Sequence, residues 1–377
     1  MGKRELVLIA VFVVLGIGLY EFTAPPPPPG SEGVSLSGIF RNIRRTVHGS
    51  RDSASADSAQ TAPVDASVKE LRVNFARWND MTVAGEDRTD VAAEMHATAR
   101  GFNPTEAKAA AEAFRLRLER VGDALVVSLD NSPAQAQPRN SNIAQLSIVL
   151  KVPKRLTLRM EPHTGRLIAG KLAGADITGS RGETRIIGFT GRVALTHSGG
   201  SLEIEDVPSL KLNARNSHGT VKHVNGPMAV DSMGGDLTVS DVVGPLEIES
   251  RNSDIRIDGR KGLKGPLRVN AAGGEIRIEG LSTEARLDGR NTAIEVTLAA
   301  SAPVTIYNLG AIRVTAPPAG YTLDAVTTEG RINVDDGEIT PSEGSDQHAA
   351  GPVRGGGPTL TLRATRGSIT VQKPAGK

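Results

Sequence analysis

The sequence predicts an all-β protein whose main body is a β-solenoid, in which short coils of about 18 residues stack on one another. Three observations predict this class. Eight units of two short alternating strands recur between residues 192 and 334, Gly, Asn or Ser occupies the turn inside most units, and the chain holds 42 glycines but only 3% aromatic residues. A unit this short cannot bury its apolar face alone and must stack on its neighbours.

The inward positions of the eight units are almost all aliphatic. The first strands are Val193-x-Leu195, Leu210-x-Leu212, Met228-x-Val230, Leu246-x-Ile248, Leu267-x-Val269, Ala285-x-Leu287, Val304-x-Ile306 and Tyr321-x-Leu323. The second strands are Leu202-x-Ile204, Val221-x-His223, Leu237-x-Val239, Ile255-x-Ile257, Ile276-x-Ile278, Ile294-x-Val296, Ile312-x-Val314 and Ile332-x-Val334. Side chains alternate between the two faces of a strand, so we expect these residues to form one core and their neighbours to face water.

The turns alternate between two types along the repeats. Gly-Gly pairs stand at 199–200, 234–235 and 273–274, whereas Arg-Asn-Ser or Arg-Asn-Thr stands at 215–217, 251–253 and 290–292. Gly and Asn tolerate the positive φ of a tight corner. Stacked Asn216, Asn252 and Asn291 could form a structural ladder of amides. The alternation also leaves open a meandering antiparallel arrangement in place of parallel coils.

Composition excludes several functional classes. The 377 residues carry 44 basic and 42 acidic side chains, a net charge of +2, with one Trp and three Tyr. A nucleic-acid binder normally has a clustered basic face with stacking aromatics, so we expect no nucleic-acid partner. The chain has no Cys, which excludes disulfides, thiolate nucleophiles and Cys-based metal sites.

Residues 1–24 predict an uncleaved signal anchor, a transmembrane helix. Lys3 and Arg4 precede an apolar run whose anchor residues are Leu6, Val7, Leu8, Ile9, Val11, Phe12, Val13, Val14, Leu15, Ile17 and Leu19. Cleavage after Ala24 is the alternative, disfavoured by Phe22 three residues before the cut and Pro25 after it. The two basic residues orient the body away from the cytoplasm. We therefore expect a single-pass protein of the bacterial inner membrane, with its body in the periplasm or outside the cell.

Residues 25–67 predict a tether. Pro25–Pro29 form a stiff polyproline spacer, and 35–48 have helical apolar spacing. That helix either lies on a membrane surface or is a linker helix. Residues 50–67 are rich in Ser, Ala and Asp and read as disordered.

Residues 68–160 predict a β-rich segment that precedes the solenoid of 161–334. Asn103 can cap a helix at 104–113, with Pro104 at its first position. Around it, alternation predicts strands at 68–75, 81–83, 91–99, 144–152 and 156–160, and a hairpin from 114 to 129.

The C-terminal part predicts a flexible loop and one further coil. Residues 335–358 are rich in Gly, Ser, Pro and acidic residues. Residues 359–377 then supply Leu360-x-Leu362 and Ile369-x-Val371. We expect this last coil to cap the stack, because a solenoid must cover its exposed strand edge.

No cluster of residues predicts catalysis, a cofactor or a metal site. The seven histidines are His48, His96, His163, His197, His218, His223 and His348. They do not converge in the pattern of a metal site, and His197 and His218 fall near corners, where we expect them to face solvent. Outward acids on adjacent coils leave glycoside cleavage by paired carboxylates open, but scattered surface charge gives the same picture.

The repeats resemble the bacterial DUF4097 family, whose members are often labelled "putative adhesins". The resemblance covers roughly residues 68–372. It is carried by Met81-Thr-Val-Ala-Gly-Glu-Asp-Arg-Thr-Asp-Val91, Arg251-Asn-Ser-Asp-Ile-Arg-Ile-Asp258 and Gly273-Gly-Glu-Ile-Arg-Ile-Glu279. It implies a β-solenoid body, often tethered at a membrane, without established catalytic residues.

Three functional hypotheses follow. The first is a non-enzymatic, membrane-anchored envelope protein that presents a binding or adhesion surface to a protein or polymer partner. The second is a self-assembling scaffold that resembles bactofilins. The third is a carbohydrate-active β-helix enzyme, disfavoured by the short coils and scattered charges. The oligomeric state and the partner do not follow from the sequence.

Overall fold

The computed structural model describes residues 52–75, 77–130, 142–335 and 337–374. The predicted signal anchor of 1–24, the polyproline spacer and the predicted helix at 35–48 lie outside the described residues. Within the described ranges, no helix combines the length and apolar character needed to span a membrane.

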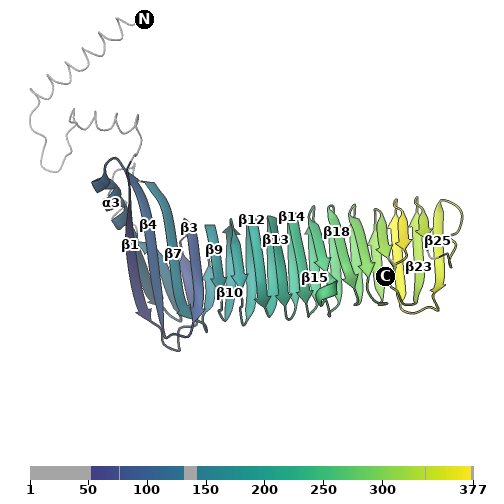
Figure 1. Cartoon of the computed structure of the whole chain (residues 1–377), viewed down its shortest axis with the longest axis horizontal. Coiled ribbons are helices and arrows are strands. Elements are labelled where there is room, and N and C mark those ends of the chain that lie inside the picture. Colours follow the sequence, from purple (N-terminus) through teal and green to yellow (C-terminus); the bar gives the residue numbers. More distant parts are fainter. Residues whose placement is uncertain (1–51, 76, 131–141, 336, 375–377) are drawn as a thin grey trace, which may run out of the picture. The chain divides into compact units, whose positions relative to one another are not determined.

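The described chain is mostly β (Figure 1). Its first strands are β1 (Asp52–Pro63), β2 (Glu70–Asn74), β3 (Arg77–Glu86), β4 (Asp90–Gly101), β5 (Arg115–Val121), β6 (Ala124–Asp130), β7 (Asn142–Pro153) and β8 (Thr157–Met160). The prediction of a disordered tether up to residue 67 is wrong for β1, which pairs with β4. Its Ser- and Ala-rich sequence lacks large apolar groups, yet a strand at the edge of a sheet needs few of them.

The described residues divide into two compact units, the first comprising 52–57, 97–114 and 142–145. Its helix α3 (Pro104–Glu112) begins as predicted, because the Asn103 side chain accepts a hydrogen bond of 2.8 Å from the Glu106 amide. Ala110 and Ala111 of this helix are buried with Ala99, and Ala56 packs against them. These small side chains let the helix lie close to the strands of its own unit.

The second unit comprises the described residues of 58–96, 115–130 and 146–374. Near its start, β5 and β6 form the predicted antiparallel hairpin. In contrast, β2 pairs in parallel with β6 and β8, and β3 pairs in parallel with β7 and β9. One strand of the predicted hairpin, β6, therefore also belongs to the parallel sheet through its pairing with β2.

The repeats continue this parallel pairing. Their strands are β9 (His163–Gly170), β10 (Gly174–Arg181), β11 (Thr184–Ile187), β12 (Arg192–Val207), β13 (Ser209–Val224), β14 (Met228–Val242), β15 (Leu246–Arg251), β16 (Asp254–Asp258), β17 (Leu267–Ala272), β18 (Glu275–Leu281), β19 (Ala285–Arg290), β20 (Ala293–Leu298), β21 (Val304–Asn308) and β22 (Ile312–Thr315). A short 3₁₀ helix, Gly259–Lys261, follows β16. Each strand pairs in parallel with the equivalent strand of the next repeat, so the antiparallel alternative is wrong here.

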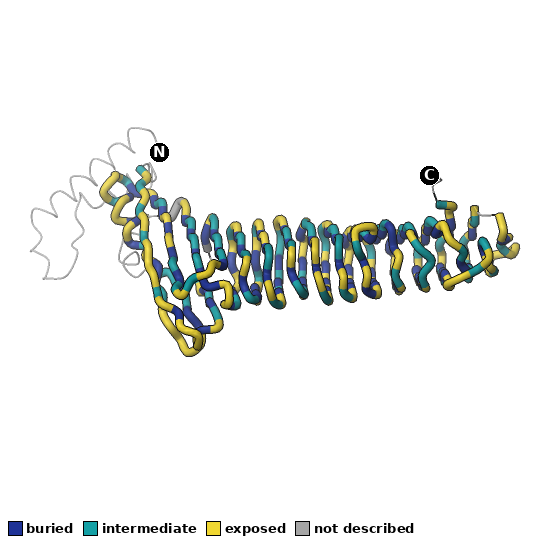
Figure 2. Tube along the Cα trace, turned by 60° about the horizontal axis from the view of Figure 1, so that its bottom comes forward, coloured by how far each residue is buried: buried dark blue, intermediate teal, exposed yellow. Residues whose placement is uncertain are grey.

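The predicted inward positions form the core, with two exceptions. Figure 2 shows buried and more exposed residues alternating along the repeats. Leu210, Ile248 and Ile278 are at most 3% exposed. His223 is exposed instead of inward, because the register aligns Val221 with Ile204 and leaves His223 beyond the core position. Val334, in the last of the eight units, is only half-buried.

The order of the last strands in space differs from their order in the sequence. They are β23 (Tyr321–Thr328), β24 (Ile332–Val334), β25 (Asp346–Val353), β26 (Thr359–Thr365) and β27 (Ile369–Gln372). β26 pairs in parallel with both β21 and β23, and β27 pairs in parallel with both β22 and β24. The C-terminal unit is thus inserted between the seventh and eighth units, and the prediction that it caps the stack is wrong.

The cap is made by the segment predicted as a flexible loop. Within 335–358, β25 pairs antiparallel with β23. Residues that precede β25 in the chain bond to backbone groups of 348–354, at and just beyond β25. The Ser342 amide donates to the His348 carbonyl, 2.9 Å, and the Glu338 carboxylate accepts from the Arg354 amide, 2.7 Å. These bonds occupy backbone groups that would otherwise form an open strand edge.

Candidate binding groove on the first-arm face

Each repeat has a first arm before its turn and a second arm after it. The first arms are 193–198, 210–215, 228–233, β15, β17, β19 and β21, and their outward surface is called the first-arm face. The second arms are β11, 202–207, 219–224, 237–242, β16, β18, β20 and β22, and their outward surface is the second-arm face. Because the strands are parallel and in register, each outward position forms a row across successive repeats.

Three adjoining depressions run along the first-arm face. They are numbered in the order of the repeats. The first and second depressions share the lining residues Lys211, Ala229 and Glu247. The second and third share Glu249 and Asn270, and the third extends to Arg290. Because neighbouring depressions share lining residues, the three form one shallow groove. It crosses the first arms from 209–215 to β19. We call it the first-arm groove.

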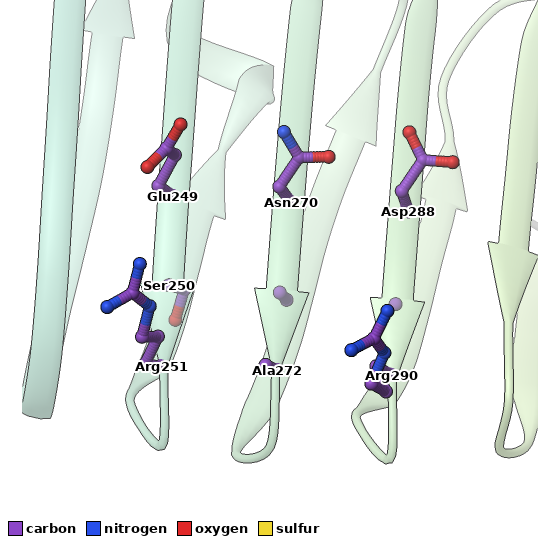
Figure 3. A pocket seen from close by; sticks show the side chains of 9 residues that line it. Glu249, Ser250, Arg251, Asn270, Ala272, Asp288 and Arg290 are labelled. Carbon is purple, nitrogen blue, oxygen red and sulfur yellow. The ribbon is translucent and has the colours of Figure 1, made fainter.

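Two charged rows line the groove at its third depression. Figure 3 shows Glu249, Asn270 and Asp288 in one row, and Arg251, Ala272 and Arg290 in the row beside the turns. The second row continues over the preceding repeats through Met233 to Arg215. The row of Glu249, Asn270 and Asp288, called the acidic row, therefore lies parallel to the row of Arg251, Ala272 and Arg290. On each strand, the members of the two rows are two residues apart.

Most charges of these rows have no ion pair. Among the described first arms from 193 to 308, the one pair is Arg286 with Asp288, 2.9 Å, and the Asp288 carboxylate raises the pKa of the Arg286 guanidinium. In the described part of the chain, the side chains of Arg215, Arg251 and Arg290 make no hydrogen bond or ion pair. These guanidinium groups are free to bind a partner.

The second-arm face differs, because ion pairs link its successive repeats. Arg185 pairs with Glu203 at 3.0 Å, and Arg277 pairs with Glu295 at 2.6 Å. The Glu295 carboxylate raises the pKa of Arg277 through a hydrogen bond. Most charges on the second-arm face of the described chain are thus paired, with Lys222, Arg256 and Arg313 as exceptions, whereas most of those on the first-arm face are not.

The predicted asparagine ladder is not continuous. Asn216, Asn252 and Asn291 each adopt a positive φ of 48° to 53°, as expected at the corners. Glycines of the intervening repeats separate them, however. The Asn216 Oδ1 lies over Gly234, and the Asn252 Oδ1 lies over Gly273. Asn216 and Asn252 therefore each pack on a glycine rather than on another amide.

A column of small and polar residues runs inside the body beneath the turns. In register order it contains His163, Ser180, His197, Ala214, Ser232, Ser250, Ala271, Gly289, Asn308, Ala364 and Thr327. Several of its polar groups satisfy turn atoms, as where Asn308 donates to the carbonyls of Thr292 and Ala311, 2.8 and 2.9 Å. The column is structural, since its side chains are buried.

The prediction that His197 faces solvent is wrong, because it belongs to this column and is fully buried. Its Nδ1 is 2.8 Å from the Ser217 hydroxyl and its Nε2 is 3.0 Å from the Gly182 carbonyl. His218 is exposed as predicted, with its Nδ1 2.9 Å from the Asp236 carboxylate.

His163 occupies the first position of the column and stacks on Trp78, with 4.6 Å between ring centroids. Its Nδ1 is 2.9 Å from the Glu161 carbonyl, and its buried Nε2 has no hydrogen-bond partner among the described residues. Burial lowers the pKa of both His163 and His197, and the nearby His197 contributes to the shift of His163. Both side chains are therefore held in the neutral form.

We expect the stability of the body to fall as the pH drops below about 6.5, the ordinary pKa of histidine. The lowered folded-state pKa means that the unfolded chain binds more protons in this range, so acid favours unfolding and stability is fully present above it. Urea unfolding of the full chain in detergent, followed by circular dichroism between pH 8 and 5, measures this. His163→Phe, which keeps an aromatic ring against Trp78, should reduce the loss of unfolding free energy below pH 6.5. If this variant loses as much stability below pH 6.5 as the unchanged protein, the buried neutral His163 is not the cause of the acid sensitivity.

The described residues hold no group of three or more His, Asp or Glu side chains placed to bind a metal ion. The predicted anchor residues 6–19 lie outside the described ranges. Sequence reasoning did not find the first-arm groove. The signal for it was present in Ala229 and Ala272, small outward residues that stand between charged residues of the adjacent repeats.

Comparison with known proteins adds two distant structural likenesses. No protein-family model matches the chain, and no curated protein matches it. A "putative cell adhesion protein" from Clostridium sporogenes is similar at 10% identity with a TM-score of 0.17, over 85% of this chain and 100% of that one. A "putative adhesin" from Parabacteroides distasonis is similar at 10% identity with a TM-score of 0.27, over 85% of this chain and 97% of that one. Both TM-scores are low, and the inferences below rest on this chain's own residues.

Proposed function

We propose that this protein is a non-enzymatic, membrane-anchored β-solenoid that presents the first-arm groove as a binding surface in the bacterial cell envelope. The observation that carries the proposal is the contrast between the two faces. Arg185 and Arg277 pair across repeats on the second-arm face, while Arg215, Arg251 and Arg290 beside the groove are unpaired. Unpaired charges in regular rows suit recognition of an external partner.

Two further features support this proposal. The apolar run of residues 6–19, behind Lys3 and Arg4, suits a single-pass anchor with the body outside the cytoplasm. The covered edge of β25 suits a body that ends there rather than one that stacks end to end as a filament. The self-assembling scaffold therefore gains no support at this end of the repeats.

Site-specific photo-crosslinking in cells tests the groove. A photoreactive amino acid placed at Ala229, in the shared lining of two depressions, should form adducts with an envelope component. The matched control is Thr238, an outward residue on the second arm of the same repeat. We expect adducts from position 229 and few from 238. Equal adduct yields at both positions would overturn the assignment of the groove.

The topology has a separate test. A reporter enzyme that is active only after export, fused after Lys377 of the full chain, should be active. A Lys3→Glu, Arg4→Glu variant should lower that activity, because it removes the positive-inside signal. Activity of a cytoplasm-specific reporter at the same position would contradict the envelope location.

A further inference from the structure

We propose that the row of arginines beside the turns binds an extended polyproline II segment that carries an acidic residue at every third position. The inference rests on the proposed function and names the chemistry of its partner. We call Arg215, Arg251 and Arg290, with the residues between them, the arginine row.

The arginine row alternates basic and apolar side chains. In register, Arg215 lies beside Met233, Met233 beside Arg251, Arg251 beside Ala272, and Ala272 beside Arg290. Met233 is 39% exposed, so its side chain offers apolar surface between two arginines of the row. Strands lie about 4.8 Å apart, so arginines on every second strand repeat about every 9.6 Å.

A polyproline II helix has the matching period. It has three residues per turn and rises about 3.1 Å per residue, so every third side chain lies on one line about 9.3 Å apart. The difference of about 0.3 Å per period is small beside the reach of an arginine side chain. Same-side residues of an extended β-strand repeat about every 6.6 Å, and two turns of an α-helix span about 10.8 Å, so neither keeps step with the row.

The chemistry of the row fits the same partner. A guanidinium group binds a carboxylate through two parallel hydrogen bonds, which Arg215, Arg251 and Arg290 have available. The exposed side chains of Met233 and Ala272 offer apolar surface to the proline rings between the acids. A polyproline II segment is already extended before it binds, which lowers the conformational entropy lost on binding.

The acidic row limits the charge density of the partner. Asp231 and Glu249 lie two residues from the arginine row along their strands and have no ion pair among the described residues. They would repel a polymer that carries a negative charge on every unit, such as nucleic acid or polyglutamate. A partner with one acid in three residues can place its carboxylates over the arginines and keep the rest of its surface neutral.

Fluorescence anisotropy of labelled peptides with the full chain in detergent tests this proposal. The probe is (Glu-Pro-Pro)₅, and two peptides control for it. (Glu-Pro-Pro-Pro)₄ changes the period, and (Gln-Pro-Pro)₅ removes the charge. We expect (Glu-Pro-Pro)₅ to bind and both controls to bind at least about 5-fold more weakly. Equal binding of the peptide with the four-residue period would overturn the register argument.

Variants locate the binding on the protein. The triple variant Arg215→Gln, Arg251→Gln, Arg290→Gln should weaken binding by about 10-fold or more, since three exposed charge pairs are lost. Arg256→Gln is the matched control, because Arg256 is an exposed, unpaired arginine on the second-arm face of the described structure. An equal loss in Arg256→Gln would show nonspecific attraction and overturn the proposal.

The outcome also separates this inference from the proposed function. If no proline-rich peptide binds while the crosslinker at Ala229 still captures an envelope component, the partner chemistry is wrong and the binding function stands. Binding of an acidic polysaccharide in place of the peptides, lost in the same triple variant, would likewise overturn the peptide partner alone. If neither the peptides nor the crosslinker reports binding, both proposals fail.

Discussion

Leu362→Ala is expected to destabilise β23, β24 and β25 together with its own strand, β26. Leu362 is fully buried, with Ile306 beside it in the register on one side and Ala325 on the other. Removing its side chain leaves a cavity, which costs about 2–5 kcal/mol. In the described chain, β23 and β24 pair with the preceding repeats only through β26 and β27. This loss should therefore weaken the attachment of β23, β24 and β25 to the rest of the body.

Hydrogen exchange with mass spectrometry measures the effect segment by segment. In Leu362→Ala, amides of 321–353 should exchange faster together with those of 359–372, while those of 192–298 keep their protection. Leu287→Ala, which removes the same side chain from a buried position in an ordinary repeat, is the matched control. Its effect should centre on β19 and its neighbours. Protection of 321–353 that survives Leu362→Ala would contradict the inserted position of the last unit.

This insertion marks the limit of prediction from the sequence. The two-residue alternation of the repeats predicted nearly every core residue, since a one-residue slip would turn Leu, Ile and Val to water. The same regularity conceals the order in space. In the sequence, Leu360-x-Leu362 and Tyr321-x-Leu323 continue the pattern of Val304-x-Ile306 equally well. In the structure, Leu360 and Leu362 lie beside Val304 and Ile306, and Leu323 and Ala325 follow them. Only the tertiary pairing shows which pair is adjacent.

The other differences also come from local geometry that composition conceals. His223 looked like a core residue because Val221 precedes it by two, but it has a positive φ of 53° and the chain turns Val224 inward instead. His197 looked like a corner residue, but its place just before the turn is an inward one. The first-arm groove escaped prediction because it depends on rows across repeats. A row appears in the sequence only after the register is known.

Gly234→Ala is expected to destabilise the body more than Gly199→Ala does, although both glycines open a Gly-Gly turn. Their φ angles are alike, 69° and 76°, and a positive φ costs a residue with a Cβ about 1–2 kcal/mol. A Cβ at Gly199 would meet nothing within 4 Å, whereas a Cβ at Gly234 would lie 2.6 Å from the Asn216 Oδ1. The second substitution therefore adds a steric clash to the same backbone cost.

A double-mutant cycle isolates this clash. Asn216→Gly removes the amide and keeps a residue suited to positive φ, so the pair Asn216→Gly and Gly234→Ala should recover the excess loss. Urea unfolding of the full chain in detergent gives the four free energies of unfolding, and we expect a coupling of about 0.5 kcal/mol or more. Additive effects of the two substitutions would mean that the asparagine does not pack on the next glycine. A positive coupling would show that the Asn216 side chain needs a residue without a Cβ at position 234 of the adjoining repeat.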